Sequence, residues 1–452
     1  MKNVIQLPAS SQMMSPHFLF GVATSSFQIE GDAAGRLPSI WDTFCATPGK
    51  IVDGSNGLNA CEHVERFEED VKMIASLGVK AYRFSISWPR VMTKTKTLNE
   101  KGIGFYEKLI AALKQYGIEA YVTLYHWDLP QHLEDQGGWL NRQTAFEYAD
   151  YVNQVVERLG DTVASYATFN EPFCSAYLGY EIGVHAPGLT GVANGRTAAH
   201  HILLAHGLGM QVIRKHTHHA QAGIVLNFTP CYPYDQSESA KDAASKADEY
   251  INQWYIKPLF DGCYPDIIEQ LTDDQKPPIL DGDLAIIQQP IDFLGVNFYT
   301  RLTYSAARND NELYYEHPHR QPQTDIGWEI YPAALTKLLV DLNNQYPLPP
   351  VYITENGAAM ADEIVNNRIQ DKGRIDYYQQ HLLAVDKAIS LGVNVVGYFA
   401  WSLMDNFEWA EGYLKRFGLV YVDYETQTRT LKDSAHAYRD LIHQRTQPNV
   451  TR

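Results

Sequence analysis

Residues 163–172 read VASYATFNEP, an apolar and aromatic run that stops at an amide, a carboxylate and a proline. The apolar part predicts a buried strand. Pro172 must end this strand, because proline has no N–H group to offer a sheet ladder. A carboxylate at the mouth of a buried strand is costly unless it is hydrogen-bonded or used. Glu171 is therefore a candidate functional residue.

The same design recurs near the other end of the chain. Residues 351–357 read VYITENG, so a second β-rich run is closed by Glu355. Two strands that each end in a glutamate are what a hydrolase with two catalytic carboxylates needs.

A repeated pattern surrounds these two runs: an amphipathic helix ends in a glycine, and a strand begins almost at once. Gly78, Gly117, Gly160 and Gly392 stand at such junctions, where a left-handed residue commonly follows a helix. The expected strands are Phe18–Ala23, Val79–Ser85, Ile118–Tyr125, Val163–Phe169, Gly223–Phe228, Ile291–Phe298, Val351–Thr354 and Val393–Trp401.

Eight strands that alternate with helices predict parallel pairing and a (β/α)8 TIM barrel. We expect one catalytic domain over residues 1–452, with a core at about residues 18–440; a doubly wound sheet is the structural alternative. Two polar segments, 234–248 and 308–324, are interpreted as insertions after strands five and six. Such loops lie on the C-terminal face of a barrel, where sites are built.

The composition narrows the class of protein. The chain has 452 residues, 45% of them hydrophobic, which is enough for a large core, and a net charge of −16. That charge argues against a nucleic-acid or anionic-membrane partner. Five scattered cysteines without a CxxC pair predict a reduced, cytosolic protein. Neither a signal-peptide core nor an apolar run of about 18 residues is found, so we expect no membrane span.

Polar and aromatic side chains stand at or just after the predicted strand ends, which meet at one face of a barrel. Amides and carboxylates can bind the hydroxyls of a sugar, and tryptophan can cover its C–H face. With two glutamates, the set suggests cleavage of a glycosidic bond. The residues are Gln28, Arg83, His126, Trp127, Asn170, Glu171, Asn297, Tyr299, Glu355, Trp401, Glu408 and Trp409.

Several motifs resemble those of the family 1 glycoside hydrolases, the β-glucosidase family. They are, in order, FGVATSSFQIEG (20–31), YRFSISWPR (82–90), HWDLP (126–130), FNEP (169–172), ITENG (353–357) and NFEW (406–409). The resemblance extends from about residue 18 to about residue 439, nearly the whole chain.

The resemblance implies a retaining β-glycosidase in which Glu171 is the general acid/base and Glu355 the nucleophile. It also implies a non-proline cis peptide after Trp401, the platform under the sugar. The implied sugar-binding residues are Gln28, His126, Asn170, Glu408 and Trp409. The nucleophile would be held by Arg83, Asn297 and Tyr299, and Trp328 would border the leaving-group subsite. Trp127 is assigned equally to the site or the core.

Neutral β-D-glucosides, including cellobiose and aryl glucosides, are the expected substrates, with β-galactosides and β-fucosides as secondary ones. Relatives that act on 6-phosphorylated sugars carry serine and lysine where this chain has Glu408 and Trp409, so we expect a sugar without phosphate. Thioglucosidases replace the acid/base by glutamine; this chain keeps Glu171, which favours ordinary O-glycosides. A 6-phospho-β-glycosidase and a non-catalytic sugar-binding barrel are the alternatives. An aldolase would need a strand-end lysine, which the eight ends lack. No cofactor is expected, and the oligomeric state is left open.

Two further clusters are given structural interpretations. His200, His201 and His206 lie on a predicted helix without HExxH spacing and away from the strand ends, so we interpret them as packing residues rather than metal ligands. The acidic run Glu65–Asp70 is interpreted as an exposed helix face.

Overall fold

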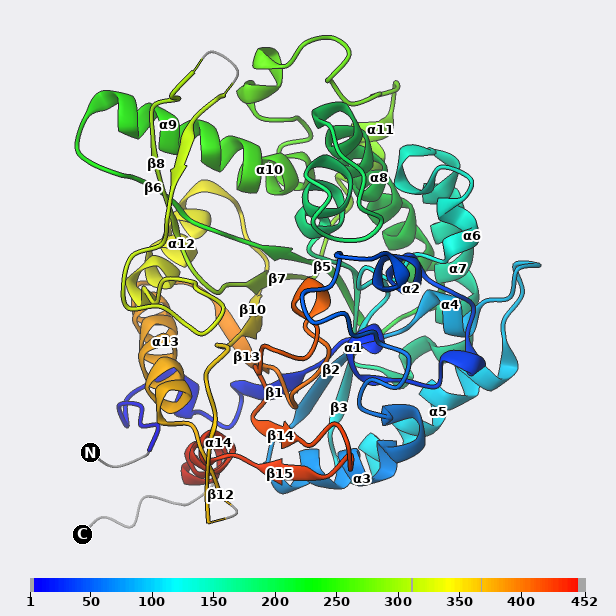
Figure 1. Cartoon of the computed structure of the whole chain (residues 1–452), viewed down its shortest axis with the longest axis vertical. Coiled ribbons are helices and arrows are strands. Elements are labelled where there is room, and N and C mark those ends of the chain that lie inside the picture. The colour runs from blue at the N-terminus through cyan, green and yellow to red at the C-terminus, as the bar shows by residue number, and fades with distance from the viewer. Residues whose placement is uncertain (1–3, 310–311, 367, 446–452) are drawn as a thin grey trace.

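The structure, a computed structural model, describes residues 4–309, 312–366 and 368–445. Its centre is a closed parallel barrel in which neighbouring strands follow the order of the chain, with helices packed around it (Figure 1). All eight expected strands are confirmed, with ends that shift by a few residues. They are β1 (Leu19–Ala23), β2 (Ala81–Ser85), β3 (Glu119–Thr123), β4 (Ser165–Asn170), β5 (Gln221–Asn227), β7 (Phe293–Asn297), β10 (Val351–Asn356) and β13 (Val395–Trp401).

Long helices connect these strands. The four glycines at the predicted junctions, Gly78, Gly117, Gly160 and Gly392, all have positive φ, at 75°, 66°, 50° and 99°. This confirms that each helix is ended by a residue in a conformation that glycine adopts most easily. The longer helices are α3 (His63–Ser76), α5 (Glu100–Gln115), α7 (Gln143–Leu159), α8 (Val192–His216), α9 (Glu238–Asp248), α12 (Pro332–Gln345), α13 (Lys372–Ser390) and α14 (Asp433–Gln444).

Shorter helices lie in the connections. They are α1 (Ser26–Ile29), α2 (Ile40–Ala46), α4 (Trp88–Val91), α6 (Gln131–Glu134), α10 (Trp254–Phe260), α11 (Asp283–Ile287), the π-helices η5 (Cys174–Glu181) and η6 (Glu249–Gln253), and the 3₁₀ turns η1 (Gln12–Met14), η2 (Ala33–Gly35), η3 (Gly138–Leu140), η4 (Gly160–Thr162), η7 (Asp266–Gln270) and η8 (Trp409–Glu411).

The two predicted insertions contain regular structure that the sequence did not predict. Helix α9 occupies most of the first, and β9 lies in the second. Together with one strand that precedes each insertion, β9 forms a small sheet in the order β6-β8-β9. In Figure 1 this sheet and α9 lie above the barrel strands. Positions 310–311 of the second insertion lie outside the described residues. The additional strands are β6 (Cys231–Pro233), β8 (Leu302–Ser305), β9 (Tyr315–His317), β11 (Glu363–Val365), β12 (Arg368–Gln370), β14 (Val420–Val422) and β15 (Arg429–Leu431).

Strand register brings the predicted site residues together. Glu355 is paired with Asn297 of the neighbouring strand, and Trp401 is paired with Ala23 across the closure of the barrel. A side chain at Gly357 would stand 1.7 Å from the carbonyl oxygen of Trp401, so only glycine fits there. The peptide bond between Trp401 and Ser402 is cis, as the resemblance implied.

One structural interpretation of the sequence is wrong. Asp70 is fully buried, not part of an exposed face, although Glu65, Glu68 and Glu69 before it are exposed. Its carboxylate contacts His63 Nδ1 at 2.8 Å and Arg429 Nε at 2.9 Å. Burial by itself would raise the pKa of Asp70, but His63 and Arg429 outweigh it and hold the pKa below its usual value. Arg429 lies 359 positions away, so local pattern could not identify this partner.

The histidine interpretation agrees with the contacts. His200 contacts Tyr264 and Asp283, His201 Nδ1 lies 2.9 Å from the carbonyl oxygen of Trp139, and His206 contacts the hydroxyl of Thr168. Among the described residues, no group of three or more His, Cys, Asp or Glu side chains is arranged to hold a metal ion. Over the same residues, no helix is both long and apolar enough to cross a bilayer.

Candidate active site

One cavity of about 580 Å³ opens at the C-terminal ends of the barrel strands. Ten of the thirteen residues predicted to form the site line it. These are His126, Trp127, Glu171, Asn297, Tyr299, Trp328, Glu355, Trp401, Glu408 and Trp409. The other three, Gln28, Arg83 and Asn170, are buried and hydrogen-bonded to lining residues.

Glu355 is held at both oxygens by strong donors. Arg83 Nη1 donates to Oε1 at 2.6 Å, and the Tyr299 hydroxyl donates to Oε2 at 2.7 Å. Arg83 and Glu355 are both buried, with side chains 3% and 4% exposed. A buried carboxylate with a cation on one oxygen and a hydroxyl on the other is suited to remain an oriented anion.

Glu171 has a different environment, although it lies in the same cavity. Asn297 Nδ2 donates to Oε1 at 2.6 Å, and the Cys174 thiol donates to Oε2 at 3.0 Å. Both donors are uncharged. Burial and, next, the negative charge of Glu355 raise the pKa of Glu171 to about 7. This carboxyl can therefore hold a proton near neutral pH and release it when the neighbouring charge changes.

An amide network connects the two glutamates. The side-chain oxygen of Asn170, Oδ1, accepts from Arg83 Nη2 at 2.7 Å and from Asn297 Nδ2 at 3.0 Å. Since its oxygen is used in this way, the Asn170 Nδ2 group must face His126 Nε2, 3.1 Å away. His126 Nε2 is then the acceptor, and the ring carries its hydrogen on Nδ1.

His126 presents that N–H group without a partner. Its Nδ1 is buried and makes no hydrogen bond to any described residue. Burial, and then the charge of Arg83, hold the pKa of His126 well below its usual value, so the ring is neutral. An unpaired buried donor in the lining of a cavity is suited to bind a ligand oxygen.

Glu408 is another carboxyl in the lining. It follows β13 in a loop held by Gln28, whose Nε2 donates to Asn406 Oδ1 at 3.0 Å and to the Phe407 carbonyl oxygen at 2.8 Å. The same Nε2 lies 3.5 Å from Glu408 Oε2. Burial, then the charge of Glu355 and of other acidic residues, raise the pKa of Glu408 to about 8.

Aromatic rings form the walls of the cavity. The ring of His126 lies nearly parallel to those of Trp401 and Trp409, at interplanar angles of 16° and 15°. Trp127 packs on Trp409 with ring centroids 4.5 Å apart and donates from Nε1 to the backbone carbonyl oxygen of Asn170. Trp127 is thus both a lining residue and a structural one. Trp328 contacts Tyr299 and Phe417 from the loop after β9.

Three residues of the lining have a strained backbone. Trp127, Glu171 and Trp409 have φ of 75°, 49° and 48°, in the left-handed region that bulky residues avoid. Each costs on the order of 1–3 kcal/mol, which persists only where the surrounding structure fixes the conformation.

The contact between Cys174 and Glu171 was not predicted from the sequence. Cys174 lies at the start of η5 and three positions after Glu171, at a spacing that places both side chains on one side of a helical turn. That spacing was the available signal, but it could not show that the thiol faces the carboxyl.

Comparisons with known proteins agree with this geometry. The family model "Glycosyl hydrolase family 1" matches residues 10–447. The β-glucosidase of Agrobacterium sp. is 45% identical and covers 94% of this chain and 94% of its own length. A bifunctional β-D-glucosidase/β-D-fucosidase of Bifidobacterium breve is 44% identical over 94% of this chain and 97% of its own.

A solved structure shows the same likeness in three dimensions. Virulence factor SghA from Agrobacterium tumefaciens, in complex with its substrate analog salicin, has a TM-score of 0.92 and 44% identity, and covers 95% of this chain and 96% of its own. The family match spans almost all of the chain, and the relatives share more than two-fifths of its residues. The chain therefore belongs to glycosyl hydrolase family 1.

Proposed function

We propose that this protein is a retaining β-glucosidase with Glu355 as nucleophile and Glu171 as general acid/base. The observation that carries the proposal is the contrast between the two carboxyl groups in one cavity. Glu355 accepts from a guanidinium and a phenol, whereas Glu171 has only neutral partners and a pKa raised to about 7 by burial and by the charge of Glu355. A nucleophile must be ionised and an acid must be protonated, and these environments provide that pair.

The reaction proceeds in two displacements. In the first, Glu355 attacks the anomeric carbon, the bond to the leaving oxygen breaks, and that oxygen takes the proton of Glu171. A glycosyl ester on Glu355 results. Its formation removes the charge that had raised the pKa of Glu171, which now acts as a base.

In the second displacement, ionised Glu171 takes a proton from a water molecule as its oxygen attacks the anomeric carbon. The ester bond breaks, Glu355 leaves as a carboxylate, and Glu171 is again protonated. Two inversions leave the released sugar in the β configuration.

The lining favours a neutral sugar. Among the described residues, the cavity is lined by neither lysine nor arginine, whereas Glu408 and Glu411 are present. A sugar phosphate would meet these carboxyls without a cation to bind it. We therefore infer β-D-glucosides as substrates, including cellobiose, with β-D-fucosides as secondary ones; the relatives named above support both. A 6-phospho-β-glycosidase is the less favoured activity.

The sugar-binding contacts follow from the unpaired groups of the lining. His126 Nδ1–H would donate to a hydroxyl, and Glu408, with its pKa raised to about 8, would donate or accept. The indole faces of Trp401 and Trp409 would cover the C–H face of the ring. Gln28 and Asn170, which lie behind the lining, would hold these groups in place for the sugar.

We also propose that the chain acts as one catalytic domain in a reducing compartment such as the cytoplasm. Five free cysteines support the compartment, because free thiols persist in a reducing environment. Fractionation of the source cells, with the activity found outside the cytoplasmic fraction, would refute that part.

Proton NMR of the hydrolysis of p-nitrophenyl β-glucoside tests the function. We expect β-glucose to appear first and to mutarotate afterwards. If α-glucose appears first, the carboxyls act through a water molecule and the mechanism is wrong. If neither the glucoside nor the corresponding galactoside, mannoside and 6-phosphoglucoside is cleaved, a non-catalytic sugar-binding barrel becomes the better interpretation.

A further inference from the structure

The thiol of Cys174 lies against the carboxyl group that the proposed mechanism uses as its acid. Its Sγ is 3.0 Å from Glu171 Oε2, and the backbone N–H of Cys174 donates to the Glu171 carbonyl oxygen at 2.9 Å. The residue is 8% exposed and contributes to the lining of the cavity. The turn that joins the two residues thus fixes the thiol relative to the carboxyl.

The other oxygen of Glu171 is the less favourable place for the mobile proton. Asn297 Nδ2 donates to Oε1, and the orientation of this amide is set because its own oxygen accepts from the Thr354 hydroxyl at 2.7 Å. Protonation of Oε1 would make it a poorer acceptor and would weaken its short bond from the Asn297 amide, which can only donate. The thiol on the other side is a weak donor and can rotate, so Oε2 is the oxygen where a proton costs less.

We propose, on the basis of the function proposed above, that Cys174 is a positioning residue for the acid/base. Its S–H group holds Glu171 Oε2 while the carboxyl is ionised, and it keeps that oxygen as the one that gives and takes back the proton. When Oε2 is protonated, sulfur is only a weak acceptor, so the proton remains available to the leaving-group oxygen.

The thiol itself stays protonated through the cycle. Burial, and then the charge of Glu171, hold the pKa of Cys174 well above its usual value. The charged groups that act on Glu171 are Glu355 on β10 and Arg83 on β2, and Glu408 after β13 in turn feels its charge. These groups are unchanged when only the thiol is replaced, so the effect of the thiol can be isolated.

The test is a set of variants at position 174. Cys174→Val removes the donor at similar size, and Cys174→Ser keeps a hydroxyl donor. The pH dependence of kcat/KM is measured with cellobiose and with 2,4-dinitrophenyl β-glucoside. Cys231→Val is the control, because Cys231 is a partly buried free cysteine whose thiol donates to the Thr229 carbonyl oxygen at 3.4 Å and does not line the active-site cavity.

For Cys174→Val, we expect the alkaline limb of kcat/KM to move up by roughly 0.5–1 pH unit, because the carboxylate loses a hydrogen bond. We also expect cellobiose hydrolysis to fall by roughly 3- to 30-fold, with a smaller loss for the dinitrophenyl substrate, which needs little acid assistance. Cys174→Ser should restore the limb to, or below, its original position.

Three outcomes would overturn the proposal: an unmoved limb in Cys174→Val, equal losses on both substrates, or the same change in Cys231→Val. Thermal melting of each variant reports whether the fold is retained, and the serine variant keeps the test valid if valine disturbs packing. The variant Glu171→Gln tests the role of Glu171 as the acid separately from the role of Cys174. If that variant loses the alkaline limb, Glu171 is the acid whatever Cys174 does.

Discussion

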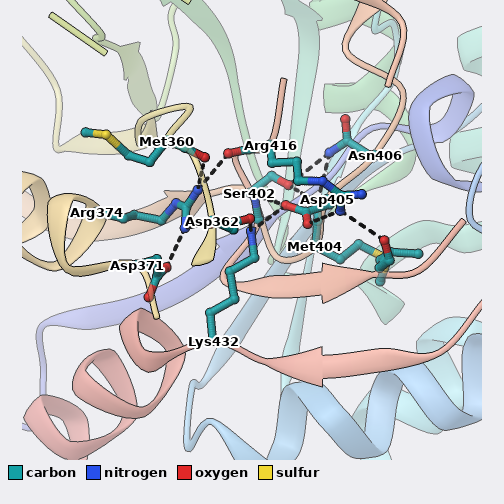
Figure 2. Close-up of polar contacts among 12 residues, drawn as sticks. Met360, Asp362, Asp371, Arg374, Ser402, Met404, Asp405, Asn406, Arg416 and Lys432 are labelled. Carbon is teal, nitrogen blue, oxygen red and sulfur yellow. Dashed lines mark hydrogen bonds and ion pairs between the residues drawn. The ribbon is translucent and has the colours of Figure 1, made fainter. Parts of the chain in front are cut away.

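Two groups of charged side chains each include a residue of the loop that follows β13, and they are balanced differently. In the first, three of the carboxyls that line the active-site cavity meet one cation. In the second group, shown in Figure 2, three carboxylates meet three cations. The cavity group is Glu171, Glu355, Glu408 and Arg83, and the second group, called here the balanced cluster, is Asp362, Asp371, Asp405, Arg374, Arg416 and Lys432.

In the balanced cluster every carboxylate has a cation in contact. Lys432 Nζ lies 2.7 Å from both Asp362 Oδ2 and Asp405 Oδ1, and Arg416 Nη1 lies 2.6 Å from Asp405 Oδ2. Arg374 pairs with Asp362 at 2.9 Å. Burial alone would raise the pKa of Asp362, but Arg374 and Lys432 outweigh it, and the pKa is lowered.

In the cavity, burial and neighbouring charges raise the pKa of the carboxyl groups instead of lowering it. Burial raises the pKa of Glu171 to about 7 and that of Glu408 to about 8, and the charge of Glu355 adds to the shift in both. Because Arg83 compensates only one carboxylate, the other two are held protonated near neutral pH. An imbalance that would weaken a structural core would here provide the proton that the proposed acid catalyst transfers.

One loop connects the two groups. Asp405 belongs to the balanced cluster, and Asn406 next to it donates to Ser402 Oγ at 2.9 Å and accepts from Gln28 at 3.0 Å (Figure 2 shows the Asn406–Ser402 contact). Glu408 follows two residues later. The balanced cluster thus anchors the chain that presents Glu408 to the cavity.

The largest expected effect is the loss of turnover when the carboxylate of Glu355 is removed from the cavity. Glu355→Gln should lower kcat by on the order of 10⁴- to 10⁶-fold, because the nucleophile is lost. Steady-state hydrolysis of an aryl β-glucoside measures it. Glu181→Gln is the control, since it breaks another buried pair, with Arg196 at 2.8 Å, outside the cavity lining. Comparable loss of turnover in the control would mean that broken ion pairs, not a lost nucleophile, explain the result.

Breaking the balance of the second group should act on stability. Lys432→Met leaves Asp362 and Asp405 with fewer cations, and we expect a loss of about 3–5 kcal/mol in the free energy of unfolding. Denaturant unfolding measures it. Lys337→Met is the matched control, because Lys337 is 60% exposed in its pair with Asp341, and surface pairs contribute about 0–1 kcal/mol. Equal losses in the two variants would contradict the comparison.

Relieving the imbalance should stabilise the fold at high pH. The pKa of Glu408 is about 8 in the folded protein and about 4.3 when unfolded. Between these values the folded state binds more protons, so wild-type stability falls as pH rises. Glu408→Gln lacks this dependence. The free energy of unfolding of this variant relative to wild type should therefore increase from pH 5 to pH 9 by about a few kcal/mol, seen as a rising difference in Tm. A difference in Tm that is constant with pH would refute this.

The smallest predicted effect concerns how kcat/KM falls at alkaline pH. Because Glu171 must be protonated to donate, wild-type kcat/KM should fall above about pH 7, the value to which its pKa is raised. Glu171→Gln should lose this limb and should spare the first step for substrates with good leaving groups. If the variant loses activity equally on poor and good leaving groups, Glu171 is not the acid.

The order of the strands and the place of the two glutamates could be predicted from the sequence. Helix stripes, terminal glycines and β-rich runs are local signals, so all eight strands and the barrel followed from them. The residues at the strand ends followed as well, because a parallel barrel brings every C-terminal end to one face. The small sheet formed by β6, β8 and β9 was missed, since its strands are short and pair across insertions.

By itself, the sequence determined which side chains reach the active face: Glu171, Glu355 and the polar and aromatic residues around them. Only the tertiary structure decided their partners. Arg83 contacts Glu355 across 272 positions of chain, and Asn297 reaches Glu171 across 126. Such contacts depend on strand register and closure of the barrel, which no local pattern encodes. Protonation depends on those partners and on burial, so the proposed division between nucleophile and acid rests on the folded barrel and not on local sequence.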